Sequence, residues 1–219
     1  MNTRPERPRH FSMLRELQLA DVFTLGNAAC GMGSVFFAMF YVADQQLSHF
    51  YTAAALAPLA FIFDVLDGRI ARWRHAHSAL GRELDSLADV ISFGVGPATL
   101  AFAAGMRGGW DLAVLIYFVC CGVSRLARFN VTAESLAAGS DSGKVAYFEG
   151  TPIPTSVLLT AVLTWCASQG QLGAELPGGA WVLGPALLHP LVLLFALSGT
   201  LMVSKTLRNP KFRIAPRCL

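Results

Sequence analysis

Charged residues are scarce in this sequence. Asp, Glu, Lys and Arg make up 14% of its 219 residues, whereas soluble domains carry about 25%. Hydrophobic residues reach 54%, and the mean hydropathy is +0.50. A soluble protein of this composition would expose large apolar patches. The composition therefore excludes a disordered chain, a collagen-like chain and an ordinary cytosolic domain. It predicts an integral membrane protein surrounded by lipids, with no role in binding nucleic acid.

The sequence also lacks a CxxC pair, an internal repeat and a low-complexity tract. Four of its five cysteines lie in apolar stretches, so we interpret them as small buried side chains rather than as redox or zinc ligands. The basic start, residues 1–10, is not followed by a short apolar segment with a cleavage site, and we expect no removable signal peptide. The absence of repeats favours one helical domain.

Long apolar runs predict an all-α, polytopic membrane bundle. A helix needs about 20 mostly apolar residues to cross the hydrocarbon, and six segments qualify: Val22–Ala43, Phe50–Ile70, Leu84–Met106, Trp110–Val131, Ile153–Gln169 and Trp181–Ser204. We expect a six-span domain over residues 22–204. It lies between a cytoplasmic N-terminal segment, residues 1–21, and a basic cytoplasmic tail, residues 205–219.

Basic residues fall almost entirely on one side of these spans. They precede the first span, lie between the second and third, lie at or after the end of the fourth and follow the sixth. Arg107 alone lies on the other side. Cytoplasmic loops carry such an excess of Lys and Arg. We therefore expect both termini to lie in the cytoplasm, with the protein in the inner, or cytoplasmic, membrane.

Residues 10–21, just before the first span, carry apolar side chains at helical spacing beside Arg15 and Glu16. This pattern fits a short interfacial helix in the headgroup layer. It also fits an ordinary segment leading into the membrane.

Four aspartates stand where a membrane protein rarely has charge. Asp64 and Asp67 are three residues apart at the end of the second span, and Asp85 and Asp89 are four apart at the start of the third. These spacings put each pair on one helix face, and a short loop makes the two helices antiparallel neighbours. Intramembrane carboxylates are costly and usually functional. Clustered carboxylate oxygens suit Mg²⁺ or Mn²⁺, and four of them can bridge two ions in a site for phosphoryl chemistry.

Small residues and one cation continue the same helix faces. Gly68 and Arg72 follow Asp64 at i+4 and i+8, Ala71 follows Asp67, and Gly81 precedes Asp85. Glycine allows a ligand or a backbone to come close, and an arginine guanidinium can hold a phosphate. The alternative is a salt-bridged helix hairpin, in which neighbouring arginines pair with the aspartates.

These residues resemble the CDP-alcohol phosphotransferase family. The family pattern D-x2-D-G-x2-A-R-x8-G-x3-D-x3-D is matched at every fixed position, from Asp64 to Asp89. The resemblance implies a CDP-linked lipid donor, two divalent ions, release of CMP and a homodimer. It implies that Asp64 and Asp85 bridge the two ions, that Asp67 is a further ligand of one ion and Asp89 of the other, and that Asp89 is the catalytic base.

The resemblance also implies the groups that bind the CDP donor. Gly68, Arg72 and Ser78 match family positions that contact the nucleotide and its phosphates, and Ala71 and Gly81 belong to the same motif. Thr24 and Asn27, in the stretch FTLGN of the first span, are further candidates.

Three further stretches resemble the branch of the family that uses L-serine as acceptor. They are RLARFN at Arg125–Asn130, FEGTPIP at Phe148–Pro154 and LMVSKTLRNPKF at Leu201–Phe212. The implied reaction transfers a phosphatidyl group from CDP-diacylglycerol to L-serine, at a site that faces the cytoplasm.

Serine carries a carboxylate, so its pocket needs a cation. Arg125 and Arg128 share a helix face near the expected site, and Asn130 and Lys144 are further candidates for binding the acceptor or its phosphate. The alternative is that the arginines anchor the helix to lipid headgroups. Rival functions are the same chemistry with glycerol 3-phosphate, an inositol phosphate or choline, and a cation transporter with an intramembrane carboxylate site.

Overall fold

The computed structural model describes residues 19–73, 79–137, 147–204 and 208–210. Two long helices come first, α2 (Leu19–Asp44) and α3 (Leu47–Trp73). The third apolar segment is one nearly continuous helical rod: α4 (Ala79–Asp89), a π-helical segment η1 (Val90–Val95) and α5 (Gly96–Ala104). Helix α6 (Gly109–Ala137) follows. The interfacial helix expected over residues 10–21 falls largely outside the described residues.

Two shorter helices complete the bundle. Helix α7 (Val157–Ser168) continues a 3₁₀ turn, η2 (Ile153–Ser156), and α8 (Leu193–Val203) continues another, η4 (Pro190–Val192). Between them lie a short 3₁₀ turn, η3 (Gly173–Glu175), and an antiparallel hairpin of β2 (Trp181–Leu183) and β3 (Ala186–Leu188). The expected helix over Trp181–Ser204 is therefore wrong at its start. Gly184 adopts a φ of 62° between the two strands, which favours a tight turn over a helix.

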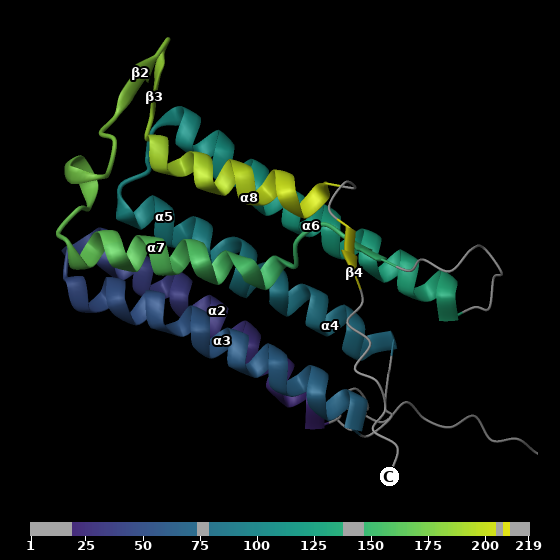
Figure 1. The fold of residues 1–219 in the computed structure, drawn as a ribbon. Coiled ribbons are helices and arrows are strands. Elements are labelled where there is room, and N and C mark those ends of the chain that lie inside the picture. The colour runs from purple at the N-terminus through teal and green to yellow at the C-terminus, as the bar shows by residue number, and fades with distance from the viewer. Residues whose placement is uncertain (1–18, 74–78, 138–146, 205–207, 211–219) are drawn as a thin grey trace, which may run out of the picture.

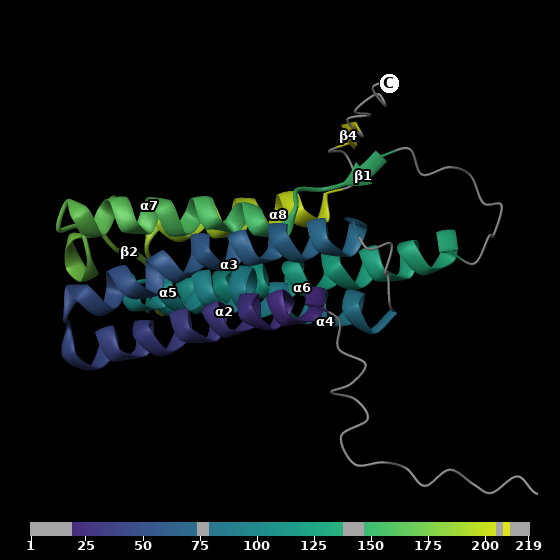
Figure 2. The same cartoon turned by 90° about the horizontal axis from the view of Figure 1, so that it is seen from below.

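The helices run roughly side by side between two faces of the bundle, with α4, η1 and α5 forming one rod (Figures 1 and 2). One face gathers the start of α2, the end of α3, the start of α4 and the ends of α6 and α8. The hairpin marks the opposite face. Arg69, Arg82 and Arg128 belong to the first face, and Arg107 belongs to the hairpin face. This separation agrees with the charge distribution expected from the sequence.

Four helical segments are long and apolar enough to cross a membrane: Ala20–Asp44, Leu47–Ile70, Leu80–Ala104 and Gly109–Thr132. The chain is an integral membrane protein. The fifth and sixth apolar helices, Ile153–Ser168 and Pro190–Val203, are shorter. At a rise of 1.5 Å per residue they would span roughly 20–25 Å, against about 30 Å of hydrocarbon.

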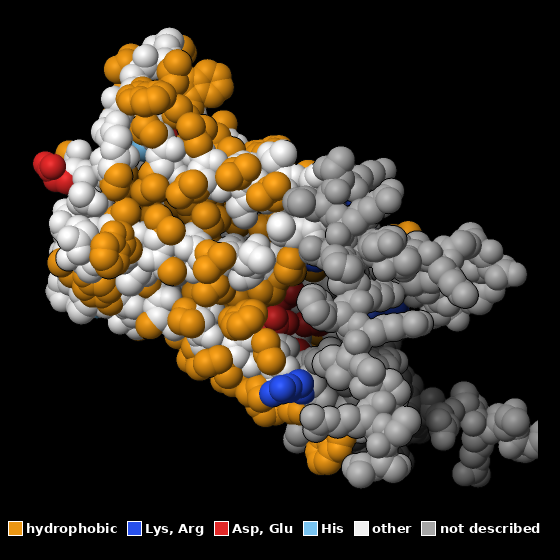
Figure 3. All heavy atoms as spheres, viewed as in Figure 1, with side chains coloured by type: hydrophobic (Ala, Val, Ile, Leu, Met, Phe, Trp, Pro, Cys, Tyr) orange, Lys and Arg blue, Asp and Glu red, His pale blue; other side chains and the backbone are white. Residues whose placement is uncertain are grey.

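Large apolar side chains occur both inside and outside the bundle. Phe118 of α6 and Phe195 of α8 stack edge to face with ring centroids 5.3 Å apart, and both are buried. Gly199 allows this close approach, because a Cβ there would lie 3.2 Å from the Phe118 Cα. On the outside, Leu158 and Trp165 of α7 are more than 60% exposed. Figure 3 shows apolar side chains spread over the described part of the visible surface, as expected for a surface that faces lipid.

A two-stranded sheet joins the segments that flank the last two helices. Strand β1 (Tyr147–Glu149) pairs antiparallel with β4 (Arg208–Pro210), near the end of α8 (Figure 2). Next to β1, Gly150 adopts a φ of 76° and lies against the Met202 carbonyl, where a Cβ would collide. The Thr151 N–H donates to the Leu201 carbonyl at 3.2 Å. Two of the stretches that resemble the serine branch, FEGTPIP and LMVSKTLRNPKF, therefore lie together.

A buried aspartate links two segments at the hairpin end of the bundle by hydrogen bonds. Asp111 of α6 is 0% exposed. It accepts hydrogen bonds from the backbone N–H groups of Gly108 and His189, at 2.9 and 2.7 Å, and it contacts the His189 Nδ1 at 2.6 Å. Asp111 thus ties the start of α6 to the segment that leads into α8.

We predict that Asp111→Ala destabilises the protein. It leaves two buried backbone donors without an acceptor, and each such loss costs about 1–3 kcal/mol. The thermal midpoint in detergent should fall by at least roughly 4 °C. Asp44→Ala is a matched control at the same face, because Asp44 forms a 2.9 Å pair with His49 in which both side chains are partly exposed. That variant should change the midpoint little. If the thermal midpoint fell equally in the two variants, Asp111 would not stabilise this end of the bundle.

Candidate active site

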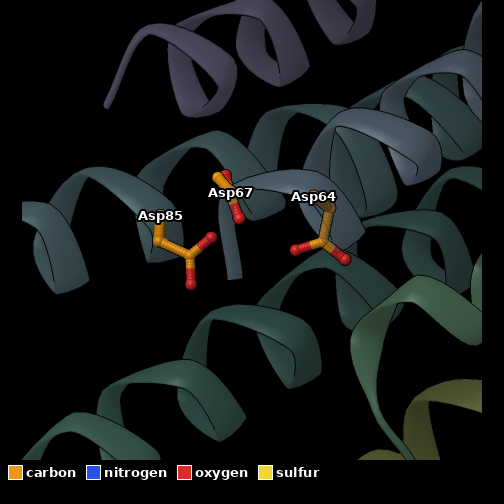
Figure 4. A group of neighbouring side chains, drawn as sticks. All are labelled: Asp64, Asp67 and Asp85. Atoms are coloured by element: carbon orange, nitrogen blue, oxygen red, sulfur yellow. The ribbon is translucent and has the colours of Figure 1, made fainter. Parts of the chain in front are cut away.

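Three of the four intramembrane aspartates meet between α3 and α4. One carboxylate oxygen from each of Asp64, Asp67 and Asp85 can be chosen so that all three lie within 4.8 Å of one another. Asp64 and Asp67 come from the last turns of α3, and Asp85 comes from the middle of α4. Figure 4 shows their side chains directed into the same space. The helical spacing that predicted two facing pairs is thus realised for these three residues.

The fourth aspartate, Asp89, stands outside this group of three, one helical turn after Asp85. It ends α4, and its side chain is 6% exposed. Its charge interacts with those of Asp64, Asp85 and Asp67. The π-helical segment η1 begins at the next residue, and π-helical turns are frequently found at functional sites.

Helix α2 supplies a polar row that faces these carboxylates. The Thr24 hydroxyl donates to the Asp67 Oδ2 at 2.8 Å, and the Asn27 Nδ2 donates to the Asp89 Oδ1 at 3.2 Å. Both α2 residues are buried. Thr24 and Asn27 were predicted to contact the nucleotide, and the structure places both against the aspartates.

Asp21 belongs to the same row, although it was not among the predicted site residues. It is 4% exposed, and its charge interacts with that of Asp67. The signal was available in the sequence, because Asp21, Thr24 and Asn27 follow one another at intervals of three and so share one helix face.

The structure separates the two arginines of α6. Arg125 is half-buried, its Nε is buried without a hydrogen-bond partner, and its charge interacts with that of Asp89. Arg128 is exposed, and its guanidinium donates to the Ser124 hydroxyl at 3.4 Å. Burial and charge thus distinguish Arg125 from the exposed Arg128, although the same role was predicted for both residues.

Asn130 connects α6 to α4. Its Nδ2 donates to Glu83 at 3.2 Å, and its Oδ1 accepts from the Ser86 hydroxyl at 3.2 Å. Both ends of this amide are thus occupied within the protein. Asn130 holds α4, the helix that carries Asp85 and Asp89, against α6.

The remaining predicted residues lie at the same end of the bundle or outside the described part. Gly68 follows Asp67 in α3, and Gly81 lies one turn before Asp85 in α4. Ala71 and Arg72 lie in the last turn of α3, but their side chains are not among those that the structure describes. Ser78 and Lys144 lie outside the described residues.

The group of three aspartates suits a divalent cation. Its carboxylates supply the hard oxygen donors that Mg²⁺ and Mn²⁺ prefer. The Asp85 Oδ1 is buried without a hydrogen-bond partner, and the structure gives neither Arg69 nor Arg82 an ion pair with the group. Among the described residues, the two ion pairs are the Asp–His pairs at the hairpin face. The described arginines thus leave the carboxylates free for a metal ion.

Comparison with known proteins identifies the family. The family model of CDP-alcohol phosphatidyltransferases matches residues 17–201, a range that contains all four aspartates. The chain belongs to this family. Its members generally depend on divalent metal ions.

Several curated relatives have names that refer to serine. The chain is 41% identical over 203 residues to a CDP-diacylglycerol–serine O-phosphatidyltransferase of Saccharomyces cerevisiae, covering 92% of this chain and 74% of the relative. A Helicobacter pylori protein of the same name is 38% identical over 144 residues, covering 65% of this chain and 55% of the relative. An archaetidylserine synthase of Methanothermobacter thermautotrophicus is 36% identical over 145 residues, again covering 65% and 55%. The chain thus spans just over half the length of the last two.

Proposed function

We propose that this protein transfers a phosphatidyl group from CDP-diacylglycerol to L-serine, giving phosphatidylserine and CMP. The single observation that carries the proposal is the group of three aspartates beside Asp89, within a chain of the CDP-alcohol phosphatidyltransferase family. The serine acceptor is supported by the relatives. The names of these relatives share serine and differ in the lipid part, phosphatidyl or archaetidyl.

The chemistry follows from the places of the side chains. Asp89 is the base that takes the proton from the serine hydroxyl, whose oxygen then forms a bond to the β-phosphorus as the bond to CMP breaks. The charge of Arg125 interacts with that of Asp89, which supports placing the base and a cation for the serine carboxylate in one site. Arg72 and Gly68 follow the aspartates on α3, where the resemblance puts contacts with the donor phosphates.

Asp64, Asp67 and Asp85 would hold divalent metal ions together with Asp89. Such ions supply charge neutralisation to the pyrophosphate and to the departing CMP. The protein's own task is to keep the carboxylates in place before the substrates arrive. Thr24 serves this task through its hydrogen bond to Asp67.

The site opens toward the cytoplasm in our proposal. The aspartates lie toward the face that gathers the basic helix ends, and such ends are cytoplasmic in membrane proteins. We further propose that all six apolar helices cross the inner membrane, the last two with the bilayer thinned around them. The protein then acts as a homodimer with both termini in the cytoplasm.

The direct test uses purified protein in detergent micelles with CDP-diacylglycerol. Serine, glycerol 3-phosphate, an inositol phosphate and choline are supplied in turn, and CMP release is measured. We expect release with serine that exceeds release with the other acceptors. CMP release with another acceptor and none with serine would support the transfer reaction and overturn the serine assignment. Absence of release with every acceptor, with cation transport in vesicles, would favour a transporter.

The separation of the two arginines predicts different kinetics for their alanine variants. Arg125→Ala should raise the KM for serine by roughly 10–100-fold, because a charge-assisted bond to the carboxylate is lost. The KM for CDP-diacylglycerol should change little. Arg128→Ala is the matched control, since Arg128 is exposed on the same helix, and its kinetics should stay close to wild type. A raised KM for the donor in Arg125→Ala would assign Arg125 to the phosphate instead.

A further inference from the structure

We propose that Asn27 is a positioning residue that holds the Asp89 carboxylate in the orientation in which it acts as base. This inference rests on the proposed function, and it gives Asn27 a role in the chemical step in place of a contact with the nucleotide. Its basis is the hydrogen bond from the Asn27 Nδ2 to the Asp89 Oδ1, 3.2 Å long and buried between α2 and the end of α4.

A second hydrogen bond holds the Asn27 backbone in place. Its backbone carbonyl accepts a hydrogen bond from the Ser92 hydroxyl at 2.8 Å. Ser92 lies in the π-helical segment η1, three residues after Asp89, and is buried. Asn27 therefore contacts the rod of α4 and η1 on both sides of the point where the helix changes its winding. If the rod turned about its own axis, the hydrogen bonds of Asn27 with Asp89 and with Ser92 would both break.

A glycine makes this contact possible. Gly31 lies one turn after Asn27 in α2, and a Cβ at Gly31 would lie 2.6 Å from the Ser92 Cα and 2.8 Å from the Ser92 N. No ordinary side chain fits in that space. The α2 backbone thus approaches η1 closely at Gly31, which brings Asn27 within reach of Asp89.

The oxygen of the Asn27 amide has no partner among the described residues, so this end of the side chain adds nothing to stability. Asn27 is 0% exposed, and its Oδ1 is buried without a hydrogen-bond partner. An unpaired buried acceptor costs stability. An apolar residue of the same size would avoid that cost. We infer that asparagine stands here for its donor group, which the Asp89 carboxylate accepts.

Two substitutions test the proposal. Asn27→Ala removes the donor and most of the side chain, and Asn27→Leu removes the donor while keeping the volume. Both should lower kcat by roughly 10–100-fold, because a hydrogen bond to a charged group is lost where the base acts. The KM for CDP-diacylglycerol and the Kd for CDP should stay within about twofold of wild type. The thermal midpoint of each variant is measured alongside, because Asp89 loses a buried hydrogen-bond donor in both.

Ser34→Ala is the matched control. Ser34 is buried on α2 and donates to the Ala53 carbonyl at 2.8 Å, two turns from Asn27 and without contact to an aspartate. Its loss removes a buried hydrogen bond of the same helix and should leave kcat near the wild-type value.

Three results would overturn the proposal. A raised KM for the donor or a weaker Kd for CDP, with kcat retained, would make Asn27 a nucleotide contact. Full kcat in Asn27→Leu would reduce its role to filling space. An equal fall of kcat in Ser34→Ala would make the effect a general one of α2. The wild-type protein with serine is measured in parallel. If it used another acceptor, the proposed function would fail, and the same variants would be compared with the acceptor that it does use.

Discussion

Asp89→Asn should almost abolish CMP release and leave donor binding largely intact. The substitution keeps the shape of the side chain and removes its ability to take a proton. Loss of a general base alone typically lowers the rate by 10²–10⁴-fold. Weaker binding of a metal ion held by Asp89 would lower the rate further. CDP affinity should fall far less, because the group of three aspartates remains.

The measurement compares kcat at saturating serine, donor and metal ion with the Kd for CDP. Asp44→Asn is the control, since Asp44 is an exposed carboxylate at the opposite face of the bundle, and it should behave as wild type. Near-normal turnover of Asp89→Asn at saturating metal would rule out Asp89 as the base. If Asp89→Asn bound CDP much more weakly than wild type, Asp89 would instead be a contact of the donor.

The arrangement of the aspartates could be predicted because it depends on local rules. Helical spacing puts Asp64 and Asp67 on one face of α3, and a short connection makes α4 an antiparallel neighbour. Apolar length predicted the four long spans in the same way. Both predictions need no knowledge of which helices lie side by side elsewhere in the bundle.

The contacts of α2 could not be predicted, because they depend on packing between helices distant in sequence. Nothing local indicates that Asn27 lies against Asp89, or that Gly31 lets the α2 backbone approach Ser92. The different exposure of Arg125 and Arg128 has the same origin. The two residues share a helix face at i, i+3, and only the neighbours of that face determine which side chain is covered.

The hairpin of β2 and β3 shows a different limit. Its residues are apolar throughout, with Trp181, Val182 and Leu183 in β2, so hydropathy alone counted them as part of a spanning helix. A short apolar run cannot be assigned to helix or strand by periodicity. Here Gly184 with its positive φ and the buried acceptor Asp111 decide the outcome.

Removal of divalent metal ions should abolish turnover completely, and Mg²⁺ or Mn²⁺ should restore it. Three carboxylate oxygens within 4.8 Å of one another repel by about 3 kcal/mol per charged pair at an effective dielectric constant near 20. A pyrophosphate would add further negative charge to the same space. Without cations, the site would repel the donor that it has to bind. Full turnover after exhaustive removal of metal, verified by elemental analysis, would contradict this prediction.

The same ions should stabilise the folded protein, which gives a readout separate from activity. A ligand that binds only the folded state raises the thermal midpoint with its concentration. We expect Mg²⁺ or Mn²⁺ to raise the midpoint of the wild-type protein and of Asp44→Asn. Asp64→Asn and Asp85→Asn should lose most of that rise. Because each substitution also relieves repulsion between carboxylates, both should be more stable than wild type in the absence of metal. A metal-induced rise that survived both substitutions would place the ions elsewhere, and the aspartates would then need another explanation.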